Sequence, residues 1–278
     1  MERFVCVNGS DNLQIPASLT EMKNITEPEQ LHLCSDKIAE ISAAMEACGW
    51  VRLPFCNTLL AETLGCKPVL SLSGARIKDA GFRKVEELPE DFSGNTPRMD
   101  AMLQALERLN AQGRQVAYNV EGPFTLLCML LPMNRVFSAL RKPAGQMMLE
   151  KTEAWISSYV DLAVEKGIKC ISFADPVATV DILGEKLFTS VYLPCLKRML
   201  NRLMAEHPDI PIHLCGKLTQ CLLDIDFCDM EDWHPENCER YGEALSALCS
   251  SGHGGLIGHF CLNFLDAKRP YLKRIKFK

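Results

Sequence analysis

The chain alternates between amphipathic helical stretches and short apolar runs, and this alternation constrains its fold more than any other feature. Apolar positions three and four residues apart predict helices, and the apolar runs between them predict strands. The clearest helices are expected at 35–49, 95–113, 144–167 and 235–252, and strands at 50–55, 115–120, 168–174, 210–214, 222–227, 255–260 and 272–277. Strands that alternate with helices form parallel β units, and strands that are apolar throughout are covered on both faces.

The number of these units favours an α/β fold, a (β/α)8 barrel of the TIM type, over a doubly wound sheet. The chain has 278 residues, and neither a linker nor an internal repeat divides it. We therefore expect one barrel domain over residues 1–278. In such a barrel the chemistry lies at the carboxyl ends of the strands, so candidate residues belong there.

Composition narrows the class of protein. The net charge is −5, which gives no basic footprint for nucleic acid. The most apolar run, 123–133, is too short for a membrane span and contains proline at both positions 123 and 132. The N-terminal stretch MERFVCVNGSD has no apolar segment of an export signal. The 14 cysteines are then expected to be reduced thiols, and we expect a cytoplasmic protein without nucleic-acid or membrane partners.

Polar side chains gather where the predicted strands end. The residues are Asn119, Glu121, Ser172, Asp175, His213, Cys215, His259 and Cys261. His213 and Cys215 are two positions apart on one strand, so both side chains point to the same side. Imidazole nitrogen and thiolate sulfur are ligands that zinc prefers, and a third ligand from another strand end would leave one position open for substrate. Cys261 is the candidate for that third ligand, although a hydrogen-bonded histidine beside a buried cysteine explains the same pair without a metal.

The two acidic residues at strand ends admit more than one role. Glu121 suits a general base, a further zinc ligand or a hydrogen-bond partner, but a carboxylate at a helix N-terminus is also favoured by the helix dipole. Asp175 precedes a proline and could simply cap the next helix. We take both as candidate catalytic residues, with Asn119, Gly122 and Ser172 as candidate cofactor-binding residues. No GxxxxGK[ST], HExxH or GxSxG pattern occurs.

Four segments in order resemble one known family. They are YNVEGPFTLL, ISFADPVATVDILGEKLF, IPIHLCGK and LIGHFCLN, and with LPFCNTLLAETLGCKPVLSLSG the resemblance runs from about residue 53 to 263. Together they resemble the uroporphyrinogen decarboxylase superfamily, and within it the cobalamin-dependent methyltransferases that act on methylcobamides. The resemblance implies a (β/α)8 barrel, and a zinc ion held by a His-x-Cys pair and a distant cysteine, here His213, Cys215 and Cys261.

The resemblance also implies an activity: transfer of a methyl group from a methylated corrinoid to a thiol such as coenzyme M or homocysteine. The corrinoid would be carried by a partner protein, because this sequence has no second domain to hold it. The chain departs from the family pattern in two ways. The interval between Cys215 and Cys261 is short, which implies one abbreviated β/α unit around 222–237 and leaves His259 as a rival third ligand.

The second departure concerns the decarboxylase branch of the same family. Its Arg-Gln-Ala-Gly-Arg segment, which grips substrate carboxylates, has no counterpart here. An octa-acid substrate requires such cationic clamps, so a metal-free decarboxylase is the less favoured alternative. A barrel that binds a corrinoid protein or a thiol without turnover is the third.

Overall fold

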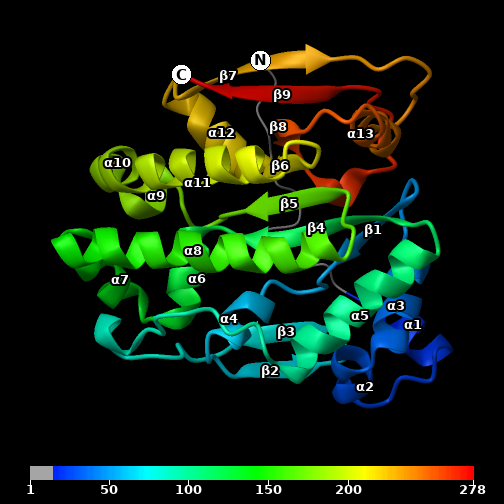
Figure 1. Cartoon of the computed structure of the whole chain (residues 1–278), viewed down its shortest axis with the longest axis horizontal. Coiled ribbons are helices and arrows are strands. Elements are labelled where there is room, and N and C mark those ends of the chain that lie inside the picture. Colours follow the sequence, from blue (N-terminus) through cyan, green and yellow to red (C-terminus); the bar gives the residue numbers. More distant parts are fainter. Residues whose placement is uncertain (1–14) are drawn as a thin grey trace.

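The computed structural model describes residues 15–278 and is built around a seven-stranded sheet (Figure 1). The N-terminal stretch in which we expect no export signal lies outside these residues. The strand order is β1-β4-β5-β6-β8-β9-β7, and the first five are parallel. These five are β1 (Trp50–Leu53), β4 (Gln115–Glu121), β5 (Cys170–Ala174), β6 (Pro211–Cys215) and β8 (Gly255–Phe260).

The longer helices follow the predicted pattern. Those that contact the parallel strands from one side are α3 (Ser35–Ala44), α5 (Pro97–Ala111), α8 (Pro143–Glu165) and α12 (Gly216–Asp224). Thr96 begins α5 because its hydroxyl accepts a hydrogen bond from the amide of Met99, and proline occupies the first helical position. The remaining helices are α1 (Ala17–Met22), α2 (Pro28–Leu33), α4 (Leu59–Thr63), α6 (Pro123–Leu130), α7 (Met133–Leu140), α9 (Val180–Leu183), α10 (Glu185–Leu187), α11 (Leu193–Glu206) and α13 (Tyr241–Ser250).

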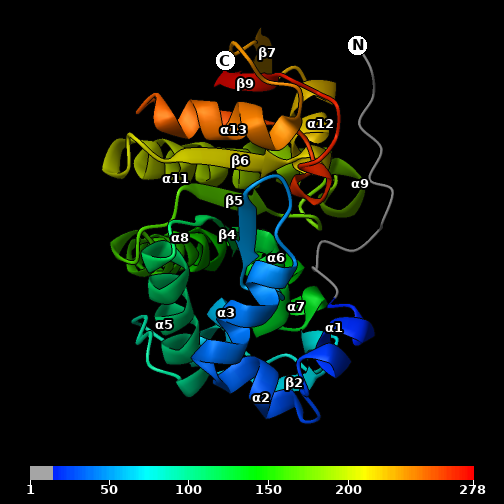
Figure 2. The ribbon, with the colours of Figure 1, turned by 90° about the vertical axis from the view of Figure 1, so that its right-hand side faces the viewer.

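Alternating strand residues divide the core into two layers. One layer lies on the side of the sheet that packs against α5 and α8, which we call the outer face, and forms the large core. The other layer lies on what we call the inner face, the side of the sheet that carries Trp50, Ala117, Cys170 and Ile257. Helix α13 packs on this inner face, and the indole nitrogen of Trp50 donates to the carbonyl of Gly242 at 2.9 Å. Figure 2 shows α13 beside β6.

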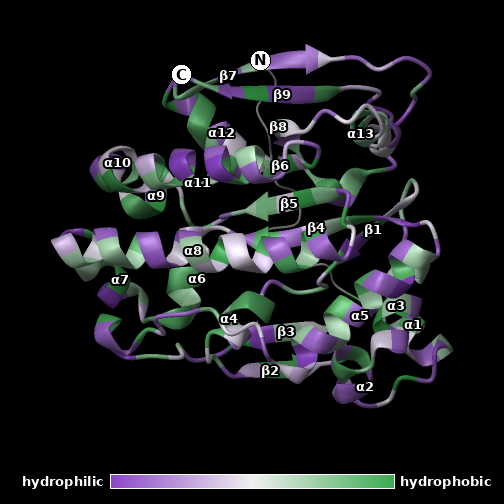
Figure 3. Ribbon diagram, viewed as in Figure 1, coloured by the Kyte–Doolittle hydropathy of each residue, from purple (hydrophilic) through white to green (hydrophobic). Residues whose placement is uncertain are grey.

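The last two strands of the sheet are antiparallel rather than parallel. Strand β9 (Leu272–Phe277) pairs antiparallel with β8, and β7 (Cys228–Trp233) pairs antiparallel with β9. The strand expected at 222–227 is wrong, because α12 continues to Asp224 and the strand begins at Cys228. This is where the abbreviated unit was expected: a short edge strand stands in place of a full parallel unit. Figure 3 shows β7 as mainly hydrophilic and β5 as mainly hydrophobic, as an edge strand and a central strand should be.

A separate two-stranded hairpin joins β2 (Pro68–Ser71) to β3 (Gly74–Ile77). The hydrogen-bonded ladder of the main sheet, within residues 15–278, begins at β1 and ends at β7. A short 3-10 helix after β8, η3 (Leu262–Phe264), returns toward β1, where the guanidinium of Arg52 donates to the side-chain oxygen of Asn263. None of the described helices is both long and apolar enough to cross a membrane.

Candidate active site

Three of the predicted site residues form a row across neighbouring strands. Asn119 of β4 pairs in register with Ser172 of β5, and Ser172 pairs with His213 of β6. Adjacent strands lie about 4.8 Å apart, so the row spans about 10 Å of sheet. These residues share the parity of Ala117 and Cys170, which places them on the inner face near the carboxyl ends of the strands. This is the edge of the sheet where the sequence placed the chemistry.

His213 is a buried, neutral imidazole. Only 2% of the residue is exposed, and its Nε2 shares a hydrogen bond of 2.8 Å with the hydroxyl of Tyr241 on α13. The two rings meet edge to face, with centroids 5.9 Å apart. Burial lowers the pKa of His213 to about 4. The uncharged form is the one that binds a metal ion or donates one hydrogen bond, so the ring is available for either task at neutral pH.

The two predicted cysteine ligands lie at the ends of adjacent strands. Cys215 is the last residue of β6 and pairs with Phe260 of β8, and Cys261 directly follows Phe260. Both cysteines are partly buried. The amide of Asn263 donates to the sulfur of Cys261 at 3.5 Å, and that sulfur acts electrostatically on Arg52 and Tyr241. The fold therefore brings the backbones of Cys215 and Cys261 side by side, although 46 positions separate them in the sequence.

His259, the rival third ligand, is turned toward another element. It has a positive φ of 60° in a segment where the pairing of β8 with β6 shifts register. Its backbone amide donates to the hydroxyl of Thr219 at 3.3 Å, and its Nε2 lies 3.2 Å from the side-chain oxygen of Gln220. Both partners belong to α12, on the outer side of the sheet, so this imidazole lies against that helix.

The ligand atoms of the predicted zinc site do not meet at one point, although their strands are neighbours. We looked for three or more histidine, cysteine or carboxylate side chains whose ligand atoms lie within 4.8 Å of one another. Within residues 15–278 this condition is met by Asp161, Glu206 and His207. The trio His213, Cys215 and Cys261 does not meet that limit. The Asp161 group lies at the surface, and Arg202 already pairs with Glu206 at 2.7 Å.

Glu121 is a buried carboxyl group at the carboxyl end of β4. Only 1% of the residue is exposed, and its Oε1 has no hydrogen-bond partner among the described residues. Burial and, less strongly, the nearby charge of Asp175 raise the pKa of Glu121 to about 8, against the opposing effects of a backbone hydrogen bond and of Arg98. The carboxyl group is therefore mainly protonated at neutral pH, with a pKa close to that of an ordinary thiol.

Asp175 is tied to the N-terminus of α6. One carboxylate oxygen accepts from the amide of Phe124 at 3.0 Å and from the hydroxyl of Tyr192 at 2.9 Å. The other accepts from the amide of Thr125 at 2.8 Å and from its hydroxyl at 2.6 Å. Burial raises the pKa of Asp175, which these four hydrogen bonds counteract. A capping role for Asp175 was one alternative that the sequence left open. The helix that Asp175 caps is α6, which follows β4, and not the helix that follows Asp175 itself.

Gly122 makes that cap possible. A Cβ atom at this position would lie 2.5 Å from the Asp175 carboxylate, closer than two such atoms can approach. Its contribution is thus the absence of a side chain. Asn119, another predicted binding residue, donates from Nδ2 to the carbonyl of Pro54 at 2.8 Å and so ties β4 to the segment after β1.

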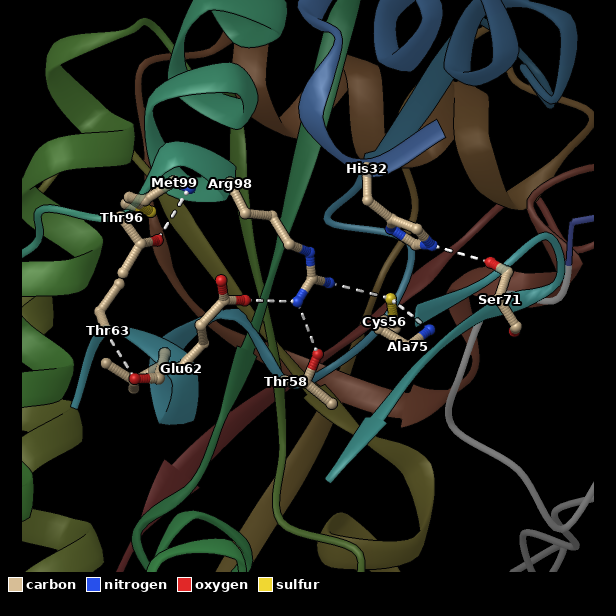
Figure 4. A network of polar contacts seen from close by, with 11 residues as sticks. His32, Cys56, Thr58, Glu62, Thr63, Ser71, Ala75, Thr96, Arg98 and Met99 are labelled. Atoms are coloured by element: carbon tan, nitrogen blue, oxygen red, sulfur yellow. Dashed lines mark hydrogen bonds and ion pairs between the residues drawn. The ribbon is translucent and has the colours of Figure 1, made fainter. Parts of the chain in front are cut away.

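Two arginines and a tyrosine near the predicted residues carry no signal in the sequence. Arg52 lies on β1 with the parity of Trp50, on the inner face. Arg98 of α5 is 1% exposed and donates to Glu62 at 2.8 Å, to the hydroxyl of Thr58 at 3.0 Å and to the sulfur of Cys56 at 3.2 Å (Figure 4). An arginine in an apolar run carries no pattern that marks it as buried. Tyr241 looks like an ordinary core aromatic until the fold places it on His213.

Comparison with known proteins decides the family. Residues 42–251 match the uroporphyrinogen decarboxylase (URO-D) family. The chain belongs to this family. As a URO-D family member it has the α/β fold of the TIM-barrel type that the sequence predicted. A solved structure, a methyltransferase from Methanosarcina mazei, shares the fold with a TM-score of 0.65 and 21% identity over 81% of this chain and 68% of that chain.

Curated relatives place this URO-D family member near the methyltransferases that the sequence resembles. The methylcobamide:CoM methyltransferase MtaA of Methanosarcina barkeri is 28% identical over 70% of this chain and 58% of its own length. The methylcobamide:CoM methyltransferase MtbA of Methanosarcina mazei is 24% identical over 71% of this chain and 61% of its own length. The chain thus spans about three fifths of the length of the curated relatives it matches. The predicted resemblance to the corrinoid methyltransferase branch is confirmed.

Proposed function

We propose that the protein is a zinc-dependent methyltransferase that moves a methyl group from a methylated corrinoid to a small thiol. The observation that carries this proposal is the meeting of β6 and β8. His213 and Cys215 lie on one strand, and Cys261 follows the residue that pairs with Cys215. One imidazole and two thiols at the carboxyl edge of a barrel-type sheet match the ligand set of a catalytic zinc site with an open position.

The residues present fit zinc chemically. His213 is neutral, and the two thiols are the soft ligands that favour zinc over calcium or magnesium. A histidine that binds a metal usually gives its second ring nitrogen to a hydrogen-bond partner that fixes the ring, and Tyr241 occupies that position at 2.8 Å. When bound, zinc would lower the pKa of a coordinated acceptor thiol and keep it as a nucleophilic thiolate.

The proton of the acceptor thiol needs a destination, and we assign it to Glu121 in the minor fraction of molecules whose Glu121 carboxyl group is ionised at neutral pH. Its pKa of about 8 lies close to that of a thiol, so proton transfer between them is nearly balanced in free energy. Asp175 has all of its hydrogen bonds within the fold and holds the N-terminus of α6 next to Glu121. Asn119 and Ser172 lie in the same row as His213 on the inner face and are assigned to the bound acceptor or corrinoid.

The corrinoid is assigned to a partner protein and the acceptor to a small thiol resembling coenzyme M or homocysteine. The relatives whose names include methylcobamide and CoM support both assignments. We also assign the protein to the cytoplasm. The cysteines of residues 15–278 form no disulfide with one another, which suits a reducing compartment.

The test is turnover of methylcobalamin, used as the donor, with a panel of small thiols and purified zinc-loaded protein. We expect methyl transfer in the wild type, and a loss of at least about 100-fold in His213→Ala and Cys215→Ala, because each removes a zinc ligand. Cys238→Ala, at a partly exposed cysteine of the segment before α13, is the matched control and should keep activity. Turnover that survives both ligand substitutions contradicts the proposal.

A further inference from the structure

Four buried side chains, which we call the polar cluster, each have a polar atom without a hydrogen-bond partner within residues 15–278. The atoms are the hydroxyl oxygens of Tyr118 and Tyr159, Nε of Arg98 and Oε1 of Glu121. At most 1% of each residue is exposed. Leaving a buried polar atom unpaired costs free energy, so native proteins pair nearly all of them with protein groups or with ordered water. The polar cluster therefore offers four atoms to a small hydrogen-bonding ligand.

The polar cluster converges from three elements. Tyr118 and Glu121 belong to β4, Tyr159 to α8 and Arg98 to α5. The two tyrosine rings pack together, with centroids 5.1 Å apart. Burial and, less strongly, the charge of Glu121 raise the pKa of both hydroxyl groups, and Arg98 opposes this effect. The four groups thus surround one place, and water fits it, because water both donates and accepts and a buried molecule usually makes about three hydrogen bonds.

Arg98 connects the polar cluster with the surface. Its Nη1 donates to Oε2 of Glu62 at 2.8 Å, and the Glu62 side chain is 16% exposed whereas that of Arg98 is 1% exposed. Contacts with the hydroxyl of Thr58 and the sulfur of Cys56 fix the same guanidinium in place (Figure 4). Glu62 is therefore a carboxylate that solvent can reach and that contacts the polar cluster directly.

Pairing of β1 with β4 brings the fixed guanidinium close to Glu121. Leu53 pairs with Tyr118, and Cys56 and Glu121 each follow three positions later. Arg98 donates to the Cys56 sulfur at 3.2 Å, and this thiol lies within electrostatic reach of both Arg98 and Glu121. The series from Glu121 through the polar cluster to Glu62 is therefore continuous in space.

Glu121 needs a route of this kind if it is to accept the proton of a thiol. Its carboxyl group is mainly protonated at neutral pH, and only 1% of the residue is exposed. It must therefore release a proton through the protein before each transfer. Hydroxyl groups and ordered water are suited to carry that proton, because each of them both donates and accepts hydrogen bonds.

We propose that the polar cluster holds ordered water and carries protons from Glu121 to Glu62, which exchanges them with solvent. The inference rests on the proposed methyltransferase function and adds proton-transfer residues to it. In each cycle the S–H bond of the thiol breaks and its proton passes to the Glu121 carboxylate. The sulfur takes the methyl group, and the electron pair of the cobalt–carbon bond stays with the corrinoid. One proton then leaves through the polar cluster, which restores the starting state.

Hydrogen–deuterium exchange of the Glu121 carboxyl group tests this route without turnover. Infrared spectroscopy follows the C=O stretch of the protonated group after transfer into D2O, at a pH below its pKa, and Glu121→Gln identifies the band by its loss. The double variant Tyr118→Phe/Tyr159→Phe and the variant Glu62→Gln should each slow the exchange by about 10-fold or more, because each removes a proton-transfer group.

Two matched controls should exchange at the wild-type rate. They are Tyr271→Phe, at a partly buried tyrosine, and Glu46→Gln, at a glutamate that pairs with Arg114 near the surface. A purely structural effect of the test variants is distinguished by its sign. Loosening of the fold admits solvent and speeds exchange, whereas loss of the route slows it.

The outcomes separate this inference from the proposed function. Exchange that stays as fast as the wild type, or becomes faster, in the double variant and in Glu62→Gln overturns the inference even if methyl transfer is found. Slowed exchange without any methyl transfer leaves the proton route standing and removes the methyltransferase function. Should the double variant fail to fold, Tyr118→Phe alone and Glu62→Gln decide the matter.

Discussion

Burial sets the protonation state of the two titratable residues that matter most. His213 and Glu121 are both almost completely shielded, and in each case desolvation favours the uncharged form. The imidazole is therefore uncharged, and the carboxyl group holds a proton at neutral pH. These two groups together add little net charge to the strand ends.

The raised pKa of Glu121 predicts a specific dependence of stability on pH. The folded state holds its proton up to about pH 8, whereas the unfolded chain releases it near pH 4.5. Between these values the folded state binds more protons, so its free energy of unfolding falls as pH rises, by up to about 1.4 kcal/mol per pH unit. Denaturant unfolding at pH 5 to 8 should show this fall in the wild type relative to Glu121→Gln. The exposed Glu236→Gln should behave as the wild type, and parallel curves for the wild type and Glu121→Gln would refute the assignment.

At the scale of elements, a cap from one strand end organises the helix after another. Asp175 follows β5 but fixes the start of α6, which follows β4, and Gly122 leaves it the space. The sequence shows an Asp-Pro pair and a Gly-Pro pair, but nothing in it states that they meet. That contact depends on the parallel pairing of β4 with β5, which brings two loops to one edge.

Removing this cap should destabilise the protein as a whole. We expect Asp175→Ala to lower the free energy of unfolding by about 2–4 kcal/mol, since it removes a helix cap and leaves the buried hydroxyl of Tyr192 unpaired. The exposed Asp181→Ala, on α9, should change it by less than about 0.5 kcal/mol. Equal effects of the two substitutions in chemical denaturation would show that the four hydrogen bonds contribute nothing specific.

Sequence periodicity predicted the parallel strands because their apolar runs are long and bounded by clear helices. The periodicity predicted a strand wrongly at 222–227. Apolar residues that alternate over so short a span occur both at the end of a helix and in a strand. The edge strand that follows, CDMEDW, carries three carboxylates, Asp229, Glu231 and Asp232, which is typical of an exposed edge. Its antiparallel pairing with β9 is a long-range choice, and local sequence does not encode it.

Part of the candidate site could likewise be predicted from the sequence, and part could not. The face on which His213, Cys215 and Asn119 lie could be predicted because side chains alternate along a strand. The contacts of Arg52 and Tyr241 could not, because they depend on η3 returning to β1 and on α13 packing against the inner face. The single-domain organisation stays a prediction.

For the whole molecule, the central claim is that β6 and β8 together hold zinc at the mouth of a URO-D fold. The competing location is the surface group of Asp161, Glu206 and His207, which offers only oxygen and nitrogen ligands. Sulfur ligands therefore separate the two sites without reference to activity.

X-ray absorption at the zinc edge of the zinc-loaded protein is the most direct test. The account predicts one zinc per chain with two sulfur ligands at about 2.3 Å and one nitrogen ligand at about 2.0–2.1 Å, and loss of the sulfur shell in Cys215→Ala and Cys261→Ala taken together. A shell of oxygen and nitrogen alone, or a chain that retains no zinc, would contradict it.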